Sequence, residues 1–246
     1  MENPNNVYNN APIIVVILQF RYDKIEDFNI EKIKVIAKKI NKRFPNTEPQ
    51  IVQGITIDNN DKETTVSLDE KRIDGIRISS KDKLEYFTIT KEVFTFQSNK
   101  KYLGWEDIID SIREFWTMFS SEFNIHILNR ISLRYVNKIN LPQDVKELTK
   151  YFTTYLKDDK NTYNISNFQF RFSSFDKENN FTIHIGHALE KQIGEAIPYL
   201  FDIDVIYPLK IKNKTEVIWP IFEKLRVKKN QIFNDGITED TKKLIK

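Results

Sequence analysis

The chain has 246 residues, of which 40% are hydrophobic and 13% aromatic, enough for a substantial core and too much for an intrinsically disordered protein. Lysine and arginine total 38 against 35 aspartate and glutamate residues, so the balance of charge argues against a protein that coats nucleic acid non-specifically. Cysteine is absent, which excludes disulfides, thiolate metal sites and cysteine nucleophiles.

The N-terminal stretch MENPNNVYNN is polar and lacks the basic and apolar regions of a secretory signal. The longest apolar run, APIIVVIL, is far shorter than the roughly 20 residues of a membrane-spanning helix. The abundance of Asn, Lys and Ile is typical of a prokaryote with an AT-rich genome. We therefore expect a cytoplasmic, prokaryotic protein with no membrane partner.

In chain order, residues 13–22 predict a strand that begins apolar on both faces and ends in alternation. Residues 30–44 carry apolar side chains at helical spacing up to Pro45, which predicts a helix. A continuous apolar stripe from Trp105 to Phe123 predicts a second, core-facing helix. Between these helices, strands are expected at 51–57, 64–68, 72–80, 83–90 and 93–97.

The second half then repeats this order. We expect a strand at 127–139, a helix at 143–157, a C-terminal helix from Thr215, and strands at 165–174, 180–188 and 200–207. The opening strands also echo each other, with RYDKI in the first half and RYVNKI in the second. The sequence therefore predicts an internal duplication.

The predicted fold class is α+β, with antiparallel strands and helices packed on one sheet face. We expect residues 1–246 to form a single compact unit of two similar lobes, 11–125 and 126–246. Each lobe would run strand, helix, three or more antiparallel strands, helix. The alternative is one continuous sheet without internal symmetry. The second sheet face would either be exposed or pack against the other lobe.

Polar side chains alternate with apolar ones along four strands of the second half, and their polar faces lie together if the strands form one sheet. The predicted ligand-binding residues are Arg130, Ser132, Arg134, Arg171, His184, Asp202 and Asp204. One interpretation is a solvated face of Arg–Asp pairs. The other is a groove in which arginine forks bind an anion. We predict that the two aspartates hold part of the arginine set and leave at least one guanidinium for an anionic ligand.

Catalytic motifs are scarce. The DIDV stretch places Asp202 and Asp204 on one strand face, as in enzymes that bind two Mg²⁺ ions, but no Gly-Ser signature precedes it. His184 and His187 of HIGH point to opposite faces of a strand and are not expected to share a zinc ion. Walker A, nucleophile-elbow and HExxH motifs are absent. We assign no catalytic residue, metal ligand or cofactor from the sequence.

The stretch RISLRYVNKINLP resembles the signature strand, R-x-x-L-R-Y-x-N-x-I, of a sporadically distributed, uncharacterised prokaryotic protein family of about this length. APIIVVILQFRY, YLGWEDI, DIDV and IFNDGITED are similar to other segments of that family, so the resemblance extends over nearly the whole chain. Ala11 stands where the family often has a second proline. The matching positions are Tyr102, Trp105, Arg130, Leu133, Arg134, Tyr135, Asn137, Asp202, Asp204, Phe233 and Thr238.

The resemblance implies no established activity or cofactor, and the patchy distribution of the family implies mobile elements or antiviral defence loci. From the sequence we expect a non-enzymatic binding module, a sensor or adaptor of a prokaryotic defence system. Its expected partners are a protein from the same operon and a nucleotide or nucleic acid. The alternative is a Mg²⁺- or Mn²⁺-dependent enzyme that acts on nucleotides or nucleic acid through Asp202 and Asp204. A third interpretation is a subunit whose polar face is only solvated and binds no ligand. The sequence specifies no oligomeric state.

Overall fold

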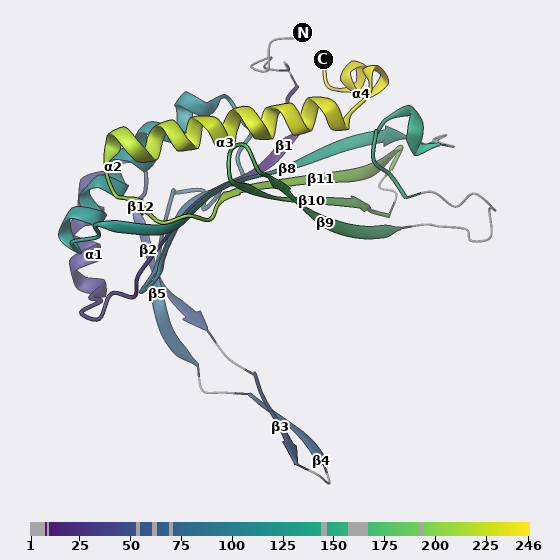
Figure 1. Cartoon of the computed structure of the whole chain (residues 1–246). Coiled ribbons are helices and arrows are strands. Elements are labelled where there is room, and N and C mark those ends of the chain that lie inside the picture. Colours follow the sequence, from purple (N-terminus) through teal and green to yellow (C-terminus); the bar gives the residue numbers. More distant parts are fainter. Residues whose placement is uncertain are drawn as a thin grey trace.

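The computed structural model describes residues 8, 10–52, 55–60, 63–68, 71–143, 147–156, 167–191 and 194–246, with the backbone alone for 55–60 and 63–68. The fold is mixed α+β, as expected. A ten-stranded antiparallel sheet carries the described helices on one of its faces (Figure 1). The predicted strand at 165–174 begins among residues that lie outside the described ones and is observed from Phe168 onward.

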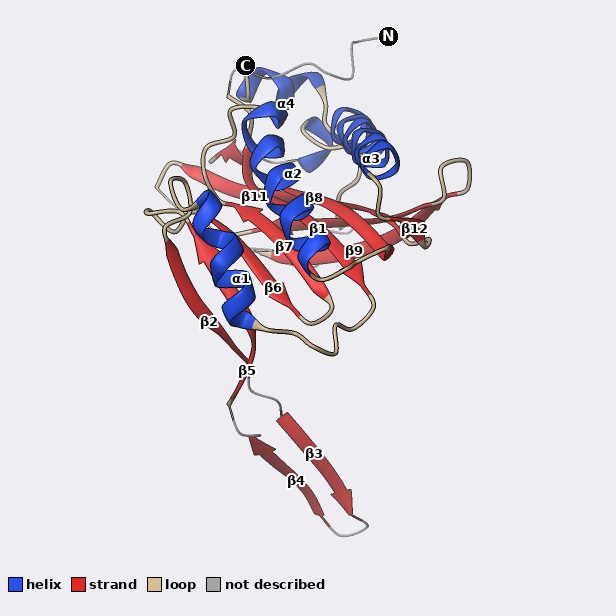
Figure 2. Ribbon diagram, turned by 90° about the vertical axis from the view of Figure 1, so that its left-hand side faces the viewer, coloured by secondary structure: helices blue, strands red, loops and turns tan. Residues whose placement is uncertain are grey.

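The sheet runs through both halves of the chain. Its order from edge to edge is β2 (Asn46–Val52), β5 (Arg72–Ser79), β6 (Glu85–Thr90), β7 (Val93–Ser98), β1 (Ile13–Tyr22), β8 (Ile127–Pro142), β11 (Ala196–Tyr207), β10 (Phe181–Leu189) and β9 (Phe168–Asp176). A short strand, β12 (Ile211–Lys212), also pairs with β8. A separate hairpin of β3 (Ile55–Asn60) and β4 (Glu63–Leu68) extends beyond the β2–β5 edge (Figure 2).

The two halves meet where β1 pairs with β8 at the centre of the sheet. Leu18 lies opposite Leu133 and Phe20 opposite Ile131 in this antiparallel register. The halves are therefore joined edge to edge in one continuous sheet. Of the two alternatives for the second sheet face, packing against the other lobe is wrong, and exposure is what the described residues show. Apolar and polar residues alternate along both β1 and β8, and each strand buries its apolar face under the same helices. This pattern explains why the two strands pair edge to edge.

The described residues form four α-helices, which cover one face of the sheet (Figure 2): α1 (Ile30–Ala37), α2 (Trp105–Glu122), α3 (Thr215–Gly236) and α4 (Glu239–Leu244). Asn29 caps α1, since its side-chain oxygen accepts hydrogen bonds from the first turn. The predicted helix over 30–44 ends sooner, in a 3₁₀ turn, η1 (Lys38–Ile40). None of the helices in the described part of the chain is both long and apolar enough to cross a membrane.

Aromatic side chains fill the space between helices and sheet. Phe20 of β1 stacks on Trp116 of α2 with ring centroids 4.2 Å apart, and Phe222 of α3 packs on the same phenylalanine at 5.2 Å. Phe94 and Phe115 continue the cluster on the first-half side. Each fully buried ring of this kind contributes about 1.5–3 kcal/mol relative to its exposed state. The helix-facing side of the sheet is thus the core, and strand alternation sends the intervening side chains to the opposite side.

The helix predicted over 143–157 is wrong for the described residues of that range, which hold only a 3₁₀ turn, η2 (Leu148–Lys150). Residues 144–146 and 157 lie outside the described ones. Phe152 explains the difference: its ring stacks on Tyr199 at 3.8 Å, and its backbone forms a bridge to Ile237. Packing against β11 and the end of α3 thus overrides the local helical pattern.

Candidate functional site: the polar face of the sheet

The side of the sheet opposite the helices, here called the polar face, brings the predicted residues together. Arg134 of β8 lies opposite Asp204 of β11, which lies opposite His184 of β10, which lies opposite Ser173 of β9. A neighbouring row contains Asp202, Gly186 and Arg171. Since no described helix lies on this side (Figure 1), the polar face is an uncovered surface of the described chain.

The pair Arg134–Asp202 is the strongest ion pair of the polar face. Arg134 donates from Nε to Asp202 Oδ1 at 2.8 Å and from Nη2 to Oδ2 at 2.6 Å. The contact raises the pKa of Arg134, with the hydrogen bond to Asp202 as the main cause. Both carboxylate oxygens are therefore engaged by one guanidinium fork, the geometry in which arginine binds carboxylates best. We predicted that both aspartates hold arginines of this face, and the structure shows such a contact for Asp202 with Arg134.

Asp204 differs from Asp202 in its hydrogen bonding. Its Oδ1 is buried and accepts no hydrogen bond within the described part of the chain. Burial, the largest cause, raises the pKa of this carboxyl above its ordinary value, although the charges of Arg134 and His184 oppose the shift. His184 itself shares a hydrogen bond with Ser173, from Nδ1 to Oγ, at 2.7 Å. Asp204 is thus an incompletely satisfied acceptor at the centre of the polar face.

Arg130 lies at the end of the polar face nearest β1. Its Nη2 donates to Oε1 of Gln19, and Gln19 Nε2 donates to Thr95 Oγ1 at 3.3 Å. Arg21 stands directly opposite Arg130 in the β1–β8 register. Burial, followed by the charge of Arg21, lowers the pKa of the Arg130 guanidinium. Two like charges therefore sit side by side, and among the described residues neither forms an ion pair with a carboxylate.

Arg171 and Ser132 complete the set of predicted residues. Arg171 is exposed on the edge strand β9 and forms no hydrogen bond or ion pair within the described residues. Ser132 is buried, with 6% of its surface exposed, between Gln19 of β1 and Ile206 of β11. The serine is therefore packed into the sheet, whereas the arginine is available at its edge.

The sequence-based search missed Gln19 and Arg21, which extend the polar face into the first half. The signal was present in ILQFRY, where these two residues alternate with Leu18, Phe20 and Tyr22. Their inclusion depended on knowing that β1 pairs with β8, which no local pattern indicates. The search also missed Lys229 of α3, which follows Ile218, Phe222 and Leu225 along the buried side of that helix.

The two histidines of HIGH lie on opposite faces, as predicted. His187 is buried beneath the helices, where its Nδ1 is 2.9 Å from the Tyr199 hydroxyl, and burial lowers its pKa to about 4. His184 lies on the polar face. Across the described residues, no group of three or more His, Asp or Glu side chains is arranged to hold a metal ion.

Comparison with protein-family models finds no match for this chain. A search of curated proteins likewise finds none. The polar face must therefore be interpreted from its own chemistry.

Proposed function

We propose that this protein is a non-enzymatic binding module, a sensor or adaptor, whose polar face binds an anionic ligand such as a nucleotide or nucleic acid. One observation carries the proposal: Arg21, Arg130 and Arg171 lie on an uncovered sheet face without a carboxylate partner in the described structure. Planar guanidinium groups are the side chains best suited to bind phosphate through paired hydrogen bonds.

The arginines of the polar face are of two kinds, one paired with an aspartate and the others without a carboxylate partner among the described residues. Asp202 neutralises Arg134 through two hydrogen bonds and so fixes the centre of the polar face. Burial raises the pKa of Asp204, which forms no comparable pair with an arginine among the described residues. The arginines on either side, Arg130 and Arg171, keep their positive charge for the ligand. This arrangement supports a site for a defined anion rather than a surface that attracts any polyanion.

A metal-dependent enzyme has less support. The sequence alternative required Asp202 and Asp204 to hold Mg²⁺ or Mn²⁺ together. Both oxygens of Asp202 accept hydrogen bonds from Arg134, so a cation there would have to displace or face a guanidinium group. We therefore favour binding over catalysis.

We also infer that the two halves arose by duplication, and that the protein acts in a defence or mobile-element setting with an operon-encoded partner. The resemblance to a sporadic prokaryotic family supports the second inference. The order of strands supports the duplication. In each half the first strand pairs with the last strand of the following meander, β1 with β7 and β8 with β11, and a long helix follows. No α-helix among the described residues of the second half corresponds to α1.

The test is a binding titration with fluorescent nucleotides and short oligonucleotides, by anisotropy, at low salt. We expect Arg130→Ala and Arg171→Ala each to weaken binding about tenfold, because each removes a charge-assisted hydrogen bond of about 1.5–3 kcal/mol. For an oligonucleotide, each variant should also reduce the salt slope by about 1.

Lys34→Ala provides the matched control, since Lys34 lies on the helix side of the molecule and also carries one positive charge. Its affinity should equal that of the wild type. If the wild type binds none of these anions, or if the arginine variants bind as tightly as the control, the polar face is a solvated surface and the proposal is wrong.

A further inference from the structure

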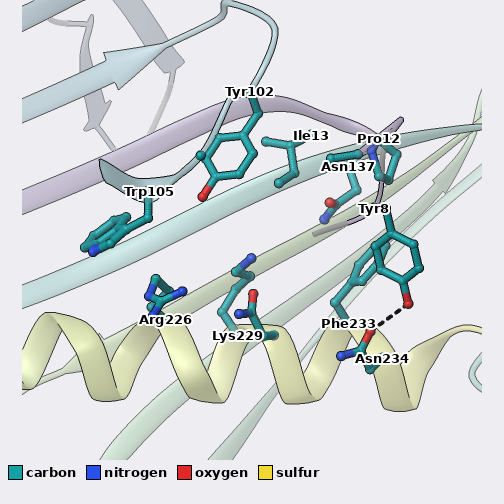
Figure 3. Close-up of a pocket in the computed structure, with 13 residues that line it drawn as sticks. Tyr8, Pro12, Ile13, Tyr102, Trp105, Asn137, Arg226, Lys229, Phe233 and Asn234 are labelled. Atoms are coloured by element: carbon teal, nitrogen blue, oxygen red, sulfur yellow. Dashed lines mark hydrogen bonds between the residues drawn. The ribbon is translucent and has the colours of Figure 1, made fainter. Parts of the chain in front are cut away.

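A small cavity lies on the other side of the sheet, between α3 and the strands β1 and β8 (Figure 3). Its volume is about 90 Å³. The lining residues come from the segment before β1, from the segment that enters α2, from β8 and from α3. They include Tyr8, Tyr102, Asn137, Arg226, Lys229 and Asn234. The cavity is separate from the polar face, because alternation along β8 sends Asn137 to one side and Arg134 to the other.

Lys229 is the unusual residue of this cavity. Only 6% of its surface is exposed, yet within the described chain it has no hydrogen bond or ion pair. Its Nζ lies 3.8 Å from the centroid of the Tyr135 ring, a cation–π contact that offers partial compensation for the charge. In Figure 3 the lysine rises from α3 into the space beneath Asn137 and Tyr102. A buried ammonium group normally has a carboxylate partner, and here that position is filled by none of the described side chains.

Glu223, a carboxylate of the same helix, is already engaged. Glu223 accepts a hydrogen bond from Trp105 Nε1 at 2.5 Å and another from Arg226 Nε at 2.9 Å. Glu223 does not line the cavity, whereas Arg226 does. The lining therefore contains two cations and no carboxylate, together with the amides of Asn137, Asn230 and Asn234.

The rest of the lining is held in place by its own contacts. The Tyr8 hydroxyl donates to Asn234 Oδ1 at 2.9 Å, and its ring packs edge-on against Phe233. Asn137 is buried, and its Nδ2 donates to the carbonyl oxygen of Phe201 at 2.9 Å. The space is thus a fixed pocket with a positive end, rather than a gap between mobile side chains.

We propose that this cavity binds the oxyanion group of a small molecule, a carboxylate or a phosphate, with Lys229 as its counter-ion and Arg226 as a second cation. The size agrees with this class, since about 10–15 Å³ holds one water molecule and the cavity is therefore several waters in size. The oxyanion replaces those waters, and the rings of Tyr102 and Phe233 contact a short organic remainder.

Protonation of Lys229 is coupled to binding. Burial, followed by the charge of Arg226, lowers the pKa of Lys229 to about 7. The charges of Glu106 on α2 and Glu223 on α3 act on Tyr102. Among the described residues, Tyr102, Tyr8 and Arg226 are the other titratable groups that line the cavity with Lys229. Tyr135 of β8 also faces it, and burial raises the pKa values of Tyr102 and Tyr135. A bound anion favours the ammonium form, so binding above pH 7 takes up a proton and weakens as the pH rises.

Isothermal titration calorimetry of the full chain tests this proposal, with acetate, succinate and inorganic phosphate as probes at pH 6 and pH 9. We expect at least one probe to bind with a Kd of about 1 mM or tighter at pH 6. The same probe should bind at least about tenfold more weakly at pH 9, and titrations at pH 8 in buffers of different ionisation enthalpy should show proton uptake. Stronger binding of the carboxylates or of phosphate identifies the source of the oxyanion.

Lys229→Met should abolish this binding, and Lys224→Met, an exposed lysine of the same helix, should leave it unchanged. Arg226→Gln gives a second variant and should weaken it several-fold. Arg171→Ala should have no effect, which separates this cavity from the polar face. The proposal is overturned if no probe binds the wild type, or if Lys229→Met and Arg226→Gln both bind like the wild type.

Discussion

Two buried charges, one in each half of the chain, have opposite surroundings. Glu85 of β6 has 2% of its side chain exposed and is met by Arg43 Nη2 at 2.8 Å and by Lys100 Nζ at 3.0 Å. Arg43 is itself fixed by hydrogen bonds from Nη1 to the Ser111 hydroxyl and the Asp107 carbonyl oxygen of α2. Lys229 of α3 is buried to a similar degree, but its neighbours are the aromatic ring of Tyr135 and a second cation, Arg226.

The comparison shows how to distinguish a buried charge that protein side chains neutralise from one whose counter-ion is a ligand. Burying a charge is costly unless another charge and hydrogen bonds compensate for it. Around Glu85, residues from several elements supply this compensation, and the cluster joins β6 to α2 and to the segments that carry Arg43 and Lys100. Around Lys229, the described residues supply cations and no counter-ion. Four substitutions sharpen or break this contrast, from the largest expected effect to the smallest.

Arg43→Met should have the largest effect. It leaves the buried Glu85 with Lys100 as its only charged partner among the described residues, so we expect a loss of about 3 kcal/mol in the free energy of unfolding at pH 7. Urea denaturation measures this change. Lys34→Met, which breaks an exposed pair with Glu31, serves as control and should cost no more than about 0.5 kcal/mol. Equal effects of the two substitutions would show that the Glu85 cluster is not structural.

Lys229→Met should act in the opposite direction. The pKa of Lys229 is about 7 in the folded protein against 10.5 in the unfolded chain, so the unfolded chain binds the proton more tightly. The resulting penalty is absent above pH 10.5, grows as the pH falls towards 7 and is constant below that. We expect the variant to be more stable by about 2 kcal/mol at pH 7, with no gain at pH 10.5. A loss of stability at pH 7 would mean that Lys229 is satisfied in the folded protein.

Asp204→Asn tests a second incompletely compensated charge. The pKa of Asp204 is raised in the folded state, so its carboxyl favours folding fully below the unfolded pKa, and this contribution is lost as the pH rises through the folded pKa. The amide should therefore stabilise the protein by about 1 kcal/mol at pH 7 and not at pH 3. Thermal melts at both pH values measure this difference. A destabilised variant at pH 7 would indicate that the charged carboxylate has a partner.

Arg171→Ala should have the smallest effect on stability, within about 0.5 kcal/mol, because the side chain is exposed and unpaired among the described residues. Arg134→Ala gives the comparison on the same face, since it removes both hydrogen bonds to Asp202 and should cost about 1 kcal/mol. Melting temperatures of the two variants, measured together, decide the order. If Arg171→Ala costs as much as Arg134→Ala, the arginine at the sheet edge is structural.

Periodicity predicted most of the fold, because strands and helices with one buried face carry their pattern locally. The strand at 13–22 and the helix that begins at Trp105 were predicted with almost their observed bounds. The helix at 143–157 was wrong because the packing of Phe152 on Tyr199 depends on residues distant in the chain. Such contacts carry no local signal.

Strand parity also predicted which side chains share the polar face, since a residue two positions along a strand returns to the same side. Strand parity could not predict that Arg134 forms its ion pair with Asp202. Asp202 lies two residues along β11 from Asp204, which is the direct cross-strand neighbour of Arg134. That choice depends on side-chain geometry. Lys229 was missed for a different reason: a lysine on the apolar side of a helix is indistinguishable in the sequence from one whose stem packs while its charge reaches water.

The pairing of β1 with β8 has a consequence for how the chain reaches its fold. Each meander can form from neighbouring segments, but β1 stays an open edge until β8 has been synthesised, with Leu18 and Phe20 awaiting Leu133 and Ile131. Pairings of such high contact order form late and slowly. On the ribosome, the first half therefore exposes the open edge of an apolar strand, a surface on which chaperones bind and aggregation begins.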